Sequence, residues 1–495
     1  MVKSTLILCL ILAACVPASL RQVPQRHTNS AILSTDLNRA LSGATDDAAM
    51  LSLGKWIESN HNHTPIQSPP GFTVRFHPGD KGIFAPGYFD RLELSAQFDA
   101  RGLTHHRQAG IGVPLAGFRE NRGRELVEKW YPPEGITRAV TAVAITGKSG
   151  QVEIRLIDRM HTDSIRIGGK KQTLAADFTV PFTRLLEKTG RLQASALNSV
   201  IRAKAEREAS FFLMEPYDPE RTPLILIHGL ISTPLAWAEL TNELWAVPEV
   251  QTRYQIWHYV YPTNPPALYS ARVMRGKLDE LRHFLDPSGG QPAMKRSVVI
   301  GHSMGGLLAK SLAVDPENAF WDAVFSRPLS SLNTTRAERT TLKEAFFWKP
   351  RGNVDRLIFC SVPFRGSNIA NSTIGKIANT IMTPSAEFQD FFIELEKKNP
   401  GMLQRDYASL TQGKITSVMT LSPHQRSMEI FDQLPLTPGT SAHVITGSRD
   451  FVVQPSSSSF VGAESSIEVP AGHGSFHHPK AVAEIIRILQ LPDAR

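Results

Sequence analysis

The residue that points most directly to chemistry is a serine set between glycines. Ser303 lies in GHSMG at 301–305, after the apolar run SVVI at 297–300 and before the helix-forming residues 306–313. A strand, a sharp turn and a helix in that order make a nucleophile elbow, in which small neighbours let the two backbones approach. The N-terminus of the following helix would also present N–H groups to an oxyanion. We therefore predict that Ser303 is a nucleophile, and that His302 is not the base but packs or hydrogen-bonds locally.

A second oxyanion donor is predicted at the end of an earlier strand. The apolar run LILI at 224–227 is followed by His228 and Gly229. A glycine at that point permits a backbone turn that leaves the next N–H free. The N–H of Leu230 would then pair with that of Met304 to form an oxyanion hole. His228 itself is expected to be structural.

A serine hydroxyl becomes nucleophilic when an imidazole takes its proton and a carboxylate orients that imidazole. On a sheet of this kind the chain order is serine, acid, histidine. Asp450 follows a predicted strand, and His473 lies between two glycines before the last predicted helix. We predict that these two complete a triad. The alternatives are Asp355, which precedes its strand, and His477 and His478, which lie beside a helix start.

Strand and helix patterns alternate from residue 222 onward, and this alternation decides the fold class. Helical spacing of apolar residues predicts one helix capped by Ser270 and a last helix that begins at Pro479. Continuous apolar runs predict buried parallel strands at 224–227, 255–261, 297–300, 356–360 and 443–446. The pattern predicts an α/β fold, a mostly parallel sheet with helices on both faces and functional residues beyond the carboxyl ends of the strands.

Two long inserts interrupt this pattern between Ser303 and Asp450. They lie near 315–353 and 368–440 and contain helix-like stretches such as 388–395. Inserts of this kind are expected to form a helical cap over the crevice. Three aromatic residues in the first insert either line a substrate pocket or pack the insert itself: Phe346, Phe347 and Trp348.

The first part of the chain has a different character. Strand-forming segments around a hairpin turn, GKSG, predict a β-rich N-terminal domain at 71–180. The polar segment 15–70 is expected to be a tether around a possible helix near 45–58. Residues 181–215 are expected to be a helical connector, and 216–495 the α/β domain. A His-His pair at 105–106 has no third ligand at useful spacing, so we expect a solvated loop and not a metal site.

The N-terminal end indicates export. Residues 1–14 hold one lysine and a short apolar run, which is too short to span a bilayer and fits a signal peptide. LAAC at 12–15 is typical of a bacterial lipobox, so we predict that Cys15 is lipidated; the alternative is a plain signal peptide that contains a cysteine. Val16 and Pro17 favour the outer membrane. Cys360 would then be the one cysteine of the folded part, packed in a strand.

The composition excludes some classes of partner. The 495 residues carry a formal charge of +8, but the basic residues are spread along the chain and form no block typical of a nucleic-acid arm. We expect no nucleic-acid partner, and the predicted chemistry needs no metal or organic cofactor.

Several of these motifs, taken in order, resemble those of bacterial α/β-hydrolase (lipase/esterase-like) lipoproteins. The resemblance rests on PLILIHGLISTPLAW, VVIGHSMGGLLAK, RLIFCSVPFRGS, RDFVV and PAGHGSFHHPKAV, and says little about 16–180. It implies the α/β-hydrolase fold, with Ser303 as nucleophile and Asp450 and His473 as its partners. Two motifs depart from the family pattern: DFVVQ at 450–454 stands where DGVVP is usual, and VPFRG at 362–366 where TPHRG is usual. Phe451 and Phe364 are the two changes expected to alter the shape of the pocket.

Together these observations predict a lipid-anchored serine hydrolase of the bacterial cell envelope. It would cleave a carboxylic ester, of lipid or of a smaller molecule, through an acyl-enzyme intermediate. Two alternatives stay open: an acyltransferase on the same triad, and a non-catalytic envelope lipoprotein whose hydrolase domain is vestigial.

Overall fold

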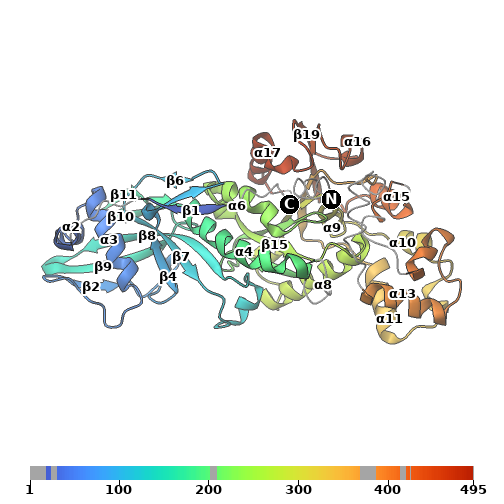
Figure 1. Ribbon diagram of the computed structural model, residues 1–495, viewed down its shortest axis with the longest axis horizontal. Coiled ribbons are helices and arrows are strands. Elements are labelled where there is room, and N and C mark those ends of the chain that lie inside the picture. The colour runs from blue at the N-terminus through green and yellow to red at the C-terminus, as the bar shows by residue number, and fades with distance from the viewer. Residues whose placement is uncertain are drawn as a thin grey trace.

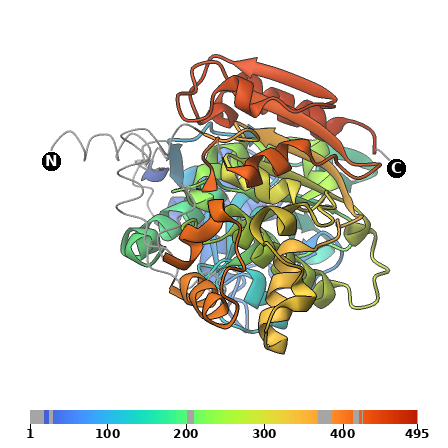
Figure 2. The ribbon, with the colours of Figure 1, turned by 90° about the vertical axis from the view of Figure 1, so that its right-hand side faces the viewer.

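The computed structural model describes residues 18–23, 30–200, 209–367, 386–412, 420–423 and 425–493. The predicted signal peptide and Cys15 therefore lie outside the described residues. Figure 1 shows one β-sheet at the left, a second sheet in the middle and the inserted helices α10, α11 and α13 at the right. Seen from that right-hand end, the C-terminal segment (red) lies along the top edge (Figure 2). Within the described ranges, no helix has the length and apolar character that crossing a membrane requires.

The N-terminal sheet is built from the segments that alternate in β-forming residues. Its strand order is β2-β9-β8-β7-β4, and β3 also pairs with β9. The strands are β2 (Thr73–Phe76), β3 (Ile83–Phe84), β4 (Arg91–Leu94), β7 (Val113–Arg119), β8 (Ile136–Thr146) and β9 (Gln151–Asp158). Short ribbons pair β1 (Ser19–Gln22) with β5 (Phe98–Arg101), β6 (Arg107–Gln108) with β12 (Ala176–Asp177), and β10 (Ser164–Ile167) with β11 (Lys170–Thr173).

The predicted tether is wrong for residues 30–60, although the helix expected near 45–58 is present. Helices α2 (Ser30–Leu41) and α3 (Asp47–Asn60) pack against one face of this sheet, and Asp46 caps α3 by accepting a bond from Ala49 N. Leu41, Leu53 and Ile57 are buried there with Leu115 and Ile154 among others. The apolar residues recur at helical spacing and form one buried face on each helix, but the segment as a whole is polar. Its composition alone therefore did not indicate packed helices.

The predicted helical connector is half right. Helix α4 (Thr179–Val200) forms where helical spacing predicted it. Ser210–Leu213, however, is a strand, β13, which pairs antiparallel with β15 at the edge of the second sheet. Four residues with two phenylalanines carry too little periodicity to separate a strand from a helix end; pairing with a neighbouring strand decides it.

The second sheet has the order β13-β15-β14-β16-β17-β18-β19, and every neighbouring pair after β13–β15 is parallel. The strands are β14 (Thr222–Ile227), β15 (Tyr254–Val260), β16 (Ser297–His302), β17 (Val354–Cys360), β18 (Ser441–Gly447) and β19 (Ser465–Val469). All five predicted strands are present. The chain runs from β14 outward to β15 and then back to β16 on the other side of β14, so the strand order reverses at β14. Ligand crevices form outside the carboxyl ends of the strands at such a point.

Side chains alternate between the two faces of this sheet. Ile225 and Ile227 of β14 belong to the core under α8 (Ala267–Leu285) and α9 (Met304–Lys310), whereas Leu224 and Leu226 face the other core. That other core includes α6 (Ala238–Trp245), α7 (Pro248–Arg253) and α17 (Pro479–Gln490). A strand with helices on both sides must be largely apolar on both faces, as β14 is.

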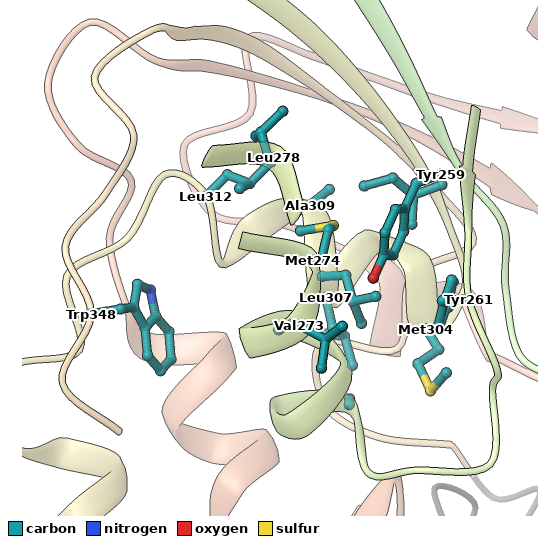
Figure 3. Close-up of a cluster of buried hydrophobic side chains, with 14 of the residues drawn as sticks. Tyr259, Tyr261, Val273, Met274, Leu278, Met304, Leu307, Ala309, Leu312 and Trp348 are labelled. Carbon is teal, nitrogen blue, oxygen red and sulfur yellow. The ribbon is translucent and has the colours of Figure 1, made fainter. Parts of the chain in front are cut away.

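The core under α8 shows how the nucleophile helix is held. Val273, Met274 and Leu278 of α8 lie against Leu307 and its neighbours on α9 (Figure 3). Full burial of each such side chain contributes about 1.5–3 kcal/mol to folding. The α8–α9 packing thus fixes the helix that begins beside Ser303. Helix α8 begins at Ala267, so the predicted cap Ser270 is buried within it; the Pro-Pro at 265–266 ends the preceding loop instead.

The two inserts form helices that pack on each other. They contain α10 (Ala319–Val324), α11 (Arg336–Phe346), α13 (Ala386–Lys398), the 3-10 helix η8 (Arg405–Gln412) and α15 (Arg426–Gln433). Phe325 and Leu403 form an isolated β-bridge between the inserts. The rest of the second insert, 368–385 and 413–419, lies outside the described residues, and its role as a cap stays a prediction.

A buried network of charges joins the N-terminal sheet to the second domain. Arg138 of β8 lies 2.6 Å from the Asp158 carboxylate and 2.7 Å from that of Glu215, and Arg221 also pairs with Glu215. Beside Arg138, His161 Nδ1 lies 2.9 Å from the Asp158 carboxylate, and His161 Nε2 lies 2.7 Å from the carboxylate of Asp218 in the second domain. Both carboxylates raise the pKa of His161. Buried charges of this kind need their partners, because an unpaired charge away from water is costly.

One buried cation has no carboxylate at salt-bridge distance among the described residues. Lys310, at the end of α9, has no exposed surface; its ammonium donates to the Phe431 carbonyl and lies 4.8 Å from the centre of the Phe460 ring. Burial lowers the pKa of this lysine to about 7.

Candidate active site

Ser303 lies on a strained turn between β16 and α9. Its φ of 53° and ψ of −129° are rarely adopted by a residue with a side chain, and such strain costs of order 1–3 kcal/mol. The turn approaches β17 so closely that only glycine fits: a Cβ on Gly306 would lie 2.0 Å from Val362 Cγ2. Ser303 N donates to Cys360 O, which anchors the turn to the end of β17. The helix starts at Met304, two residues earlier than predicted.

The structure brings the three predicted triad residues together. Ser303 Oγ lies 3.0 Å from His473 Nε2, and His473 Nδ1 lies 2.8 Å from Asp450 Oδ2. A carboxylate only accepts, so Nδ1 carries the hydrogen and Nε2 is free to accept the serine proton. Asp450 and Ser303 are buried, whereas the His473 side chain keeps 24% of its surface exposed.

Backbone bonds between two loops set the distance from acid to base. Asp450 lies just after β18 and His473 just after β19, the neighbouring edge strand. Ser448 N donates to Val469 O at 2.9 Å, and Arg449 N donates to Ala471 O at 3.0 Å. The parallel pairing of β18 with β19 therefore continues into the loops and carries the two functional residues side by side.

The Asp450 carboxylate is held in its charged form. Burial alone would raise its pKa, but the bond from the His473 ring and the N–H bonds from Val453 and Val452 outweigh burial and leave the pKa below its ordinary value. The unusual neighbour Phe451 is 94% exposed, so it leaves the carboxylate undisturbed. Phe364, the other departure from the family pattern, is fully buried against Phe359 and Phe460.

The two predicted oxyanion donors lie at the ends of neighbouring strands, β14 and β16. Met304 is the first residue of α9, where an N–H has no partner within the helix. Two hydrogen bonds to the segment after β15 hold the turn that carries Leu230: Ile231 N donates to Thr263 Oγ1 at 3.1 Å, and Tyr261 Oη donates to His228 O at 2.9 Å. Within the described part of the chain, neither the Leu230 nor the Met304 N–H has a recorded acceptor.

The alternative acid and base lie elsewhere. Asp355 is at the start of β17, at the opposite end of the sheet from Ser303. His477 Nδ1 contacts Glu239 at 2.9 Å, and His478 caps α17 by accepting from Lys480 N. His228 is buried and stacked on Tyr261, and burial lowers its pKa to about 4, as a structural histidine requires.

The His-His pair at 105–106 is not the solvated loop that the sequence suggested. His105 Nε2 lies 2.8 Å from Asp177, and His106 Nε2 lies 3.0 Å from Glu243 of the second domain. Through these contacts the pair joins its own segment to β12 and to α6. Across the described ranges, no three His, Cys, Asp or Glu side chains form a group suited to a metal ion. Cys360 is buried in β17, and burial raises the pKa of its thiol.

An apolar pocket between α8 and the inserts does not include the predicted triad residues. It has a cavity volume of about 100 Å³ and is lined by Tyr269, Phe346, Phe388, Tyr407 and Met428 among others. Phe346 therefore does both things considered from sequence, since it lines this pocket and is buried in the core. Trp348 stacks on Phe320 and packs the insert.

A family model described as the alpha/beta hydrolase family matches residues 224–485, which is more than half of the chain. The chain belongs to the alpha/beta hydrolase family. The match begins in β14 and ends in α17, so it covers the elbow, the acid loop and the base loop of this hydrolase. No curated protein matches the chain.

Solved structures with a similar arrangement include several hydrolases. The mature lipase BlEst2 of Bacillus licheniformis is 13% identical with a TM-score of 0.34, over 58% of this chain and 100% of that one. A lipase-esterase related protein from Clostridium acetobutylicum ATCC 824 is 13% identical with a TM-score of 0.31, over 57% of this chain and 99% of that one. The enol-lactonase from Burkholderia xenovorans LB400 is 16% identical with a TM-score of 0.31, over 58% of this chain and 99% of that one. None of these similarities is strong enough to indicate a substrate.

Proposed function

We propose that this alpha/beta hydrolase is a serine hydrolase that cleaves carboxylic esters through an acyl-enzyme intermediate. The observation that supports this most is the chain of hydrogen bonds from Asp450 through His473 to Ser303, at 2.8 and 3.0 Å. The serine sits on a strained turn at the point where the strand order reverses. Nucleophile and base within 2.6–3.2 Å, with the base oriented by a third group, are the mark of covalent catalysis.

The reaction would run in two halves. Ser303 Oγ attacks the ester carbonyl carbon while His473 Nε2 takes its proton, and the Leu230 and Met304 N–H groups stabilise the oxyanion. The C–O bond to the alcohol then breaks, and the imidazolium returns the proton to the leaving oxygen. Water, deprotonated by the same imidazole, attacks the acyl carbonyl and releases the carboxylic acid and free Ser303. Asp450 stabilises the imidazolium in both halves.

Covalent labelling tests this proposal without knowledge of the substrate. A fluorophosphonate probe should label wild-type protein, and the Ser303→Ala variant should neither label nor hydrolyse p-nitrophenyl esters. Ser361→Ala, which removes a buried serine bonded to Ser475 Oγ at 3.0 Å, is the matched control and should keep labelling. A folded wild-type protein that refuses the probe would overturn the proposal. Product analysis with an added alcohol separates hydrolysis from acyl transfer.

We further propose that Cys15 carries the lipid that anchors this hydrolase to the bacterial cell envelope. The support is the short apolar leader that ends in LAAC at 12–15. Acyl chains stabilise membrane binding by about 0.8 kcal/mol for each buried methylene. In a bacterial host, Cys15→Ala should abolish palmitate incorporation and release the protein from the membrane fraction. Cys9→Ala, inside the leader, is the control and should change neither; equal palmitate labelling of both variants would refute lipidation at Cys15.

A further inference from the structure

His302, the residue before the nucleophile, contacts the loop that carries the base. Its Nε2 lies 2.9 Å from the backbone carbonyl oxygen of His473, and the two ring centres are 4.7 Å apart. A carbonyl oxygen only accepts hydrogen bonds, so His302 Nε2 must carry the hydrogen. The tautomer of His302 is thereby fixed by the base loop itself.

Two aromatic residues that pack on each other, Trp237 and Phe476, hold the His302 ring in place. The ring is only 8% exposed and lies 4.7 Å from the Phe476 ring and 6.5 Å from that of Trp237, centre to centre. Phe476 belongs to the 3-10 helix η9 (Ser475–His477), which follows the base loop, and Trp237 to η4 (Pro234–Trp237), which follows the oxyanion turn. The ring thus packs against the segments that follow two functional loops.

The other edge of the ring faces the oxyanion turn. A Cβ on Gly229 would lie 3.0 Å from His302 Nδ1 and 2.8 Å from Ser303 Cβ, so only glycine fits between them. Nδ1 has no hydrogen-bond partner among the described residues. The His302 ring therefore lies between the oxyanion turn and the base loop, with Nε2 donating to the base loop and Nδ1 facing the turn at Gly229.

We infer that His302 is a positioning residue that holds His473 over Ser303 through its bond to the His473 carbonyl, an inference that rests on the proposed hydrolase function. The imidazole of His473 must stay within hydrogen-bond distance of Ser303 Oγ and then of the leaving oxygen. Its loop lies beyond an edge strand, and displacement by 1 Å can reduce turnover about 100-fold. The His302 bond ties that loop to the elbow itself.

Charge supports the same role. Burial, reinforced by the nearby imidazole of His473, holds the pKa of His302 well below its ordinary value. A neutral His302 places no second cation beside the imidazolium that forms on His473 during each half of the reaction. A permanently charged residue at this position would oppose that step.

Three substitutions of His302 separate the hydrogen bond from packing. His302→Gln places an amide nitrogen at the position of Nε2, His302→Asn places it at the position of Nδ1, and His302→Met fills the space with no donor. With a short p-nitrophenyl ester, we expect His302→Met and His302→Asn to lower kcat by about 10- to 100-fold with KM within about twofold. His302→Gln should retain at least a fifth of wild-type kcat. A purely structural role would not give rescue by Gln alone.

Amide hydrogen exchange of the full chain supplies a readout that does not depend on turnover. Peptides covering 470–478 should exchange faster in His302→Met than in wild type or His302→Gln, with the thermal midpoints of all three recorded as the folding control. Met and Gln variants with equal kcat and equal exchange would overturn the inference. An inactive, unlabelled wild-type protein would instead refute the hydrolase proposal, and the exchange result would still decide whether His302 anchors the loop.

Discussion

Replacing Asp450 by asparagine or by alanine separates what this carboxylate does for catalysis from what it does for the fold. One oxygen, Oδ1, accepts from the N–H groups of Val452 and Val453 at 2.8 and 2.9 Å, and the other accepts from His473. Asparagine keeps an oxygen for the two amides but presents an NH₂ to His473 Nδ1. Alanine removes both contacts. The two variants should therefore differ in stability and agree in inactivity.

The magnitudes follow from these contacts. An NH₂ group facing Nδ1 forces the imidazole hydrogen onto Nε2, which can then no longer accept the Ser303 proton. Loss of the correct tautomer lowers kcat by about 10⁴, or about 5.4 kcal/mol in the barrier. In Asp450→Ala, each amide left without an acceptor costs about 1–3 kcal/mol. We therefore expect this variant to lose about 2–4 kcal/mol of unfolding free energy, and Asp450→Asn no more than about 1–2 kcal/mol.

Two assays on the same preparations test this. Urea unfolding gives the stability order, and p-nitrophenyl butyrate turnover gives kcat. The pKa of Asp450 is lowered in the folded protein, so its charged form contributes stability above the unfolded value, and that contribution disappears as the pH falls through the acid range. The stability gap between wild type and Asp450→Asn should thus be constant from about pH 6 to 8 and shrink below about pH 4. If Asp450→Asn keeps more than a tenth of wild-type kcat, the tautomer argument fails.

Three other substitutions test the packing described above. Gly306→Ala should prevent folding or remove all turnover, because its Cβ would overlap Val362, whereas Gly276→Ala, with no atom within 4 Å of the added Cβ, should be neutral or stabilising in thermal unfolding; equal behaviour of the two would refute the close approach. Lys310 has a pKa of about 7 when folded against 10.5 ordinarily, so the unfolded chain binds more protons between these values. Wild-type stability should therefore rise relative to Lys310→Met by about 1.4 kcal/mol per pH unit from about pH 7.5 to 9.5, and a flat difference would show that the folded lysine stays charged. Arg138→Met removes one partner from each of two buried carboxylates, Asp158 and Glu215, and should cost about 3–5 kcal/mol in urea unfolding at pH 7.5; a loss under 1 kcal/mol would contradict the network's role.

Prediction from sequence succeeded where a signal was local and strong. The five predicted strands, β14 to β18, contain apolar runs because helices cover both faces of the sheet, and each run is visible without knowledge of its neighbours. Ser303 was identifiable for the same reason, since strand, glycines and helix all lie within 297–313. It failed at Ser30–Leu41, where a packed helix in a polar segment was interpreted as part of a tether, and at Ser210–Leu213, which becomes a strand by pairing with β15. The helix expected near 45–58 is present as α3.

The roles of histidines divide in the same way. His473 could be proposed from its place after a strand and between glycines, but His302 looked like any buried neighbour of a nucleophile. Its contact with the His473 carbonyl joins residues 171 positions apart. No local sequence pattern predicts that bond. The contact between His106 and Glu243, which joins two domains, is equally invisible in the sequence.

By itself, the sequence determined the fold class and predicted the turn at Ser303 and the order of serine, acid and histidine, because periodicity and glycine placement act over a few residues. Only the tertiary structure decided which acid and which histidine meet Ser303. That choice depends on β18 and β19 lying side by side and on backbone bonds that extend their pairing into the loops. Distances of 2.8 and 3.0 Å between residues far apart in the chain are products of sheet order and register, which arise only when the whole core packs.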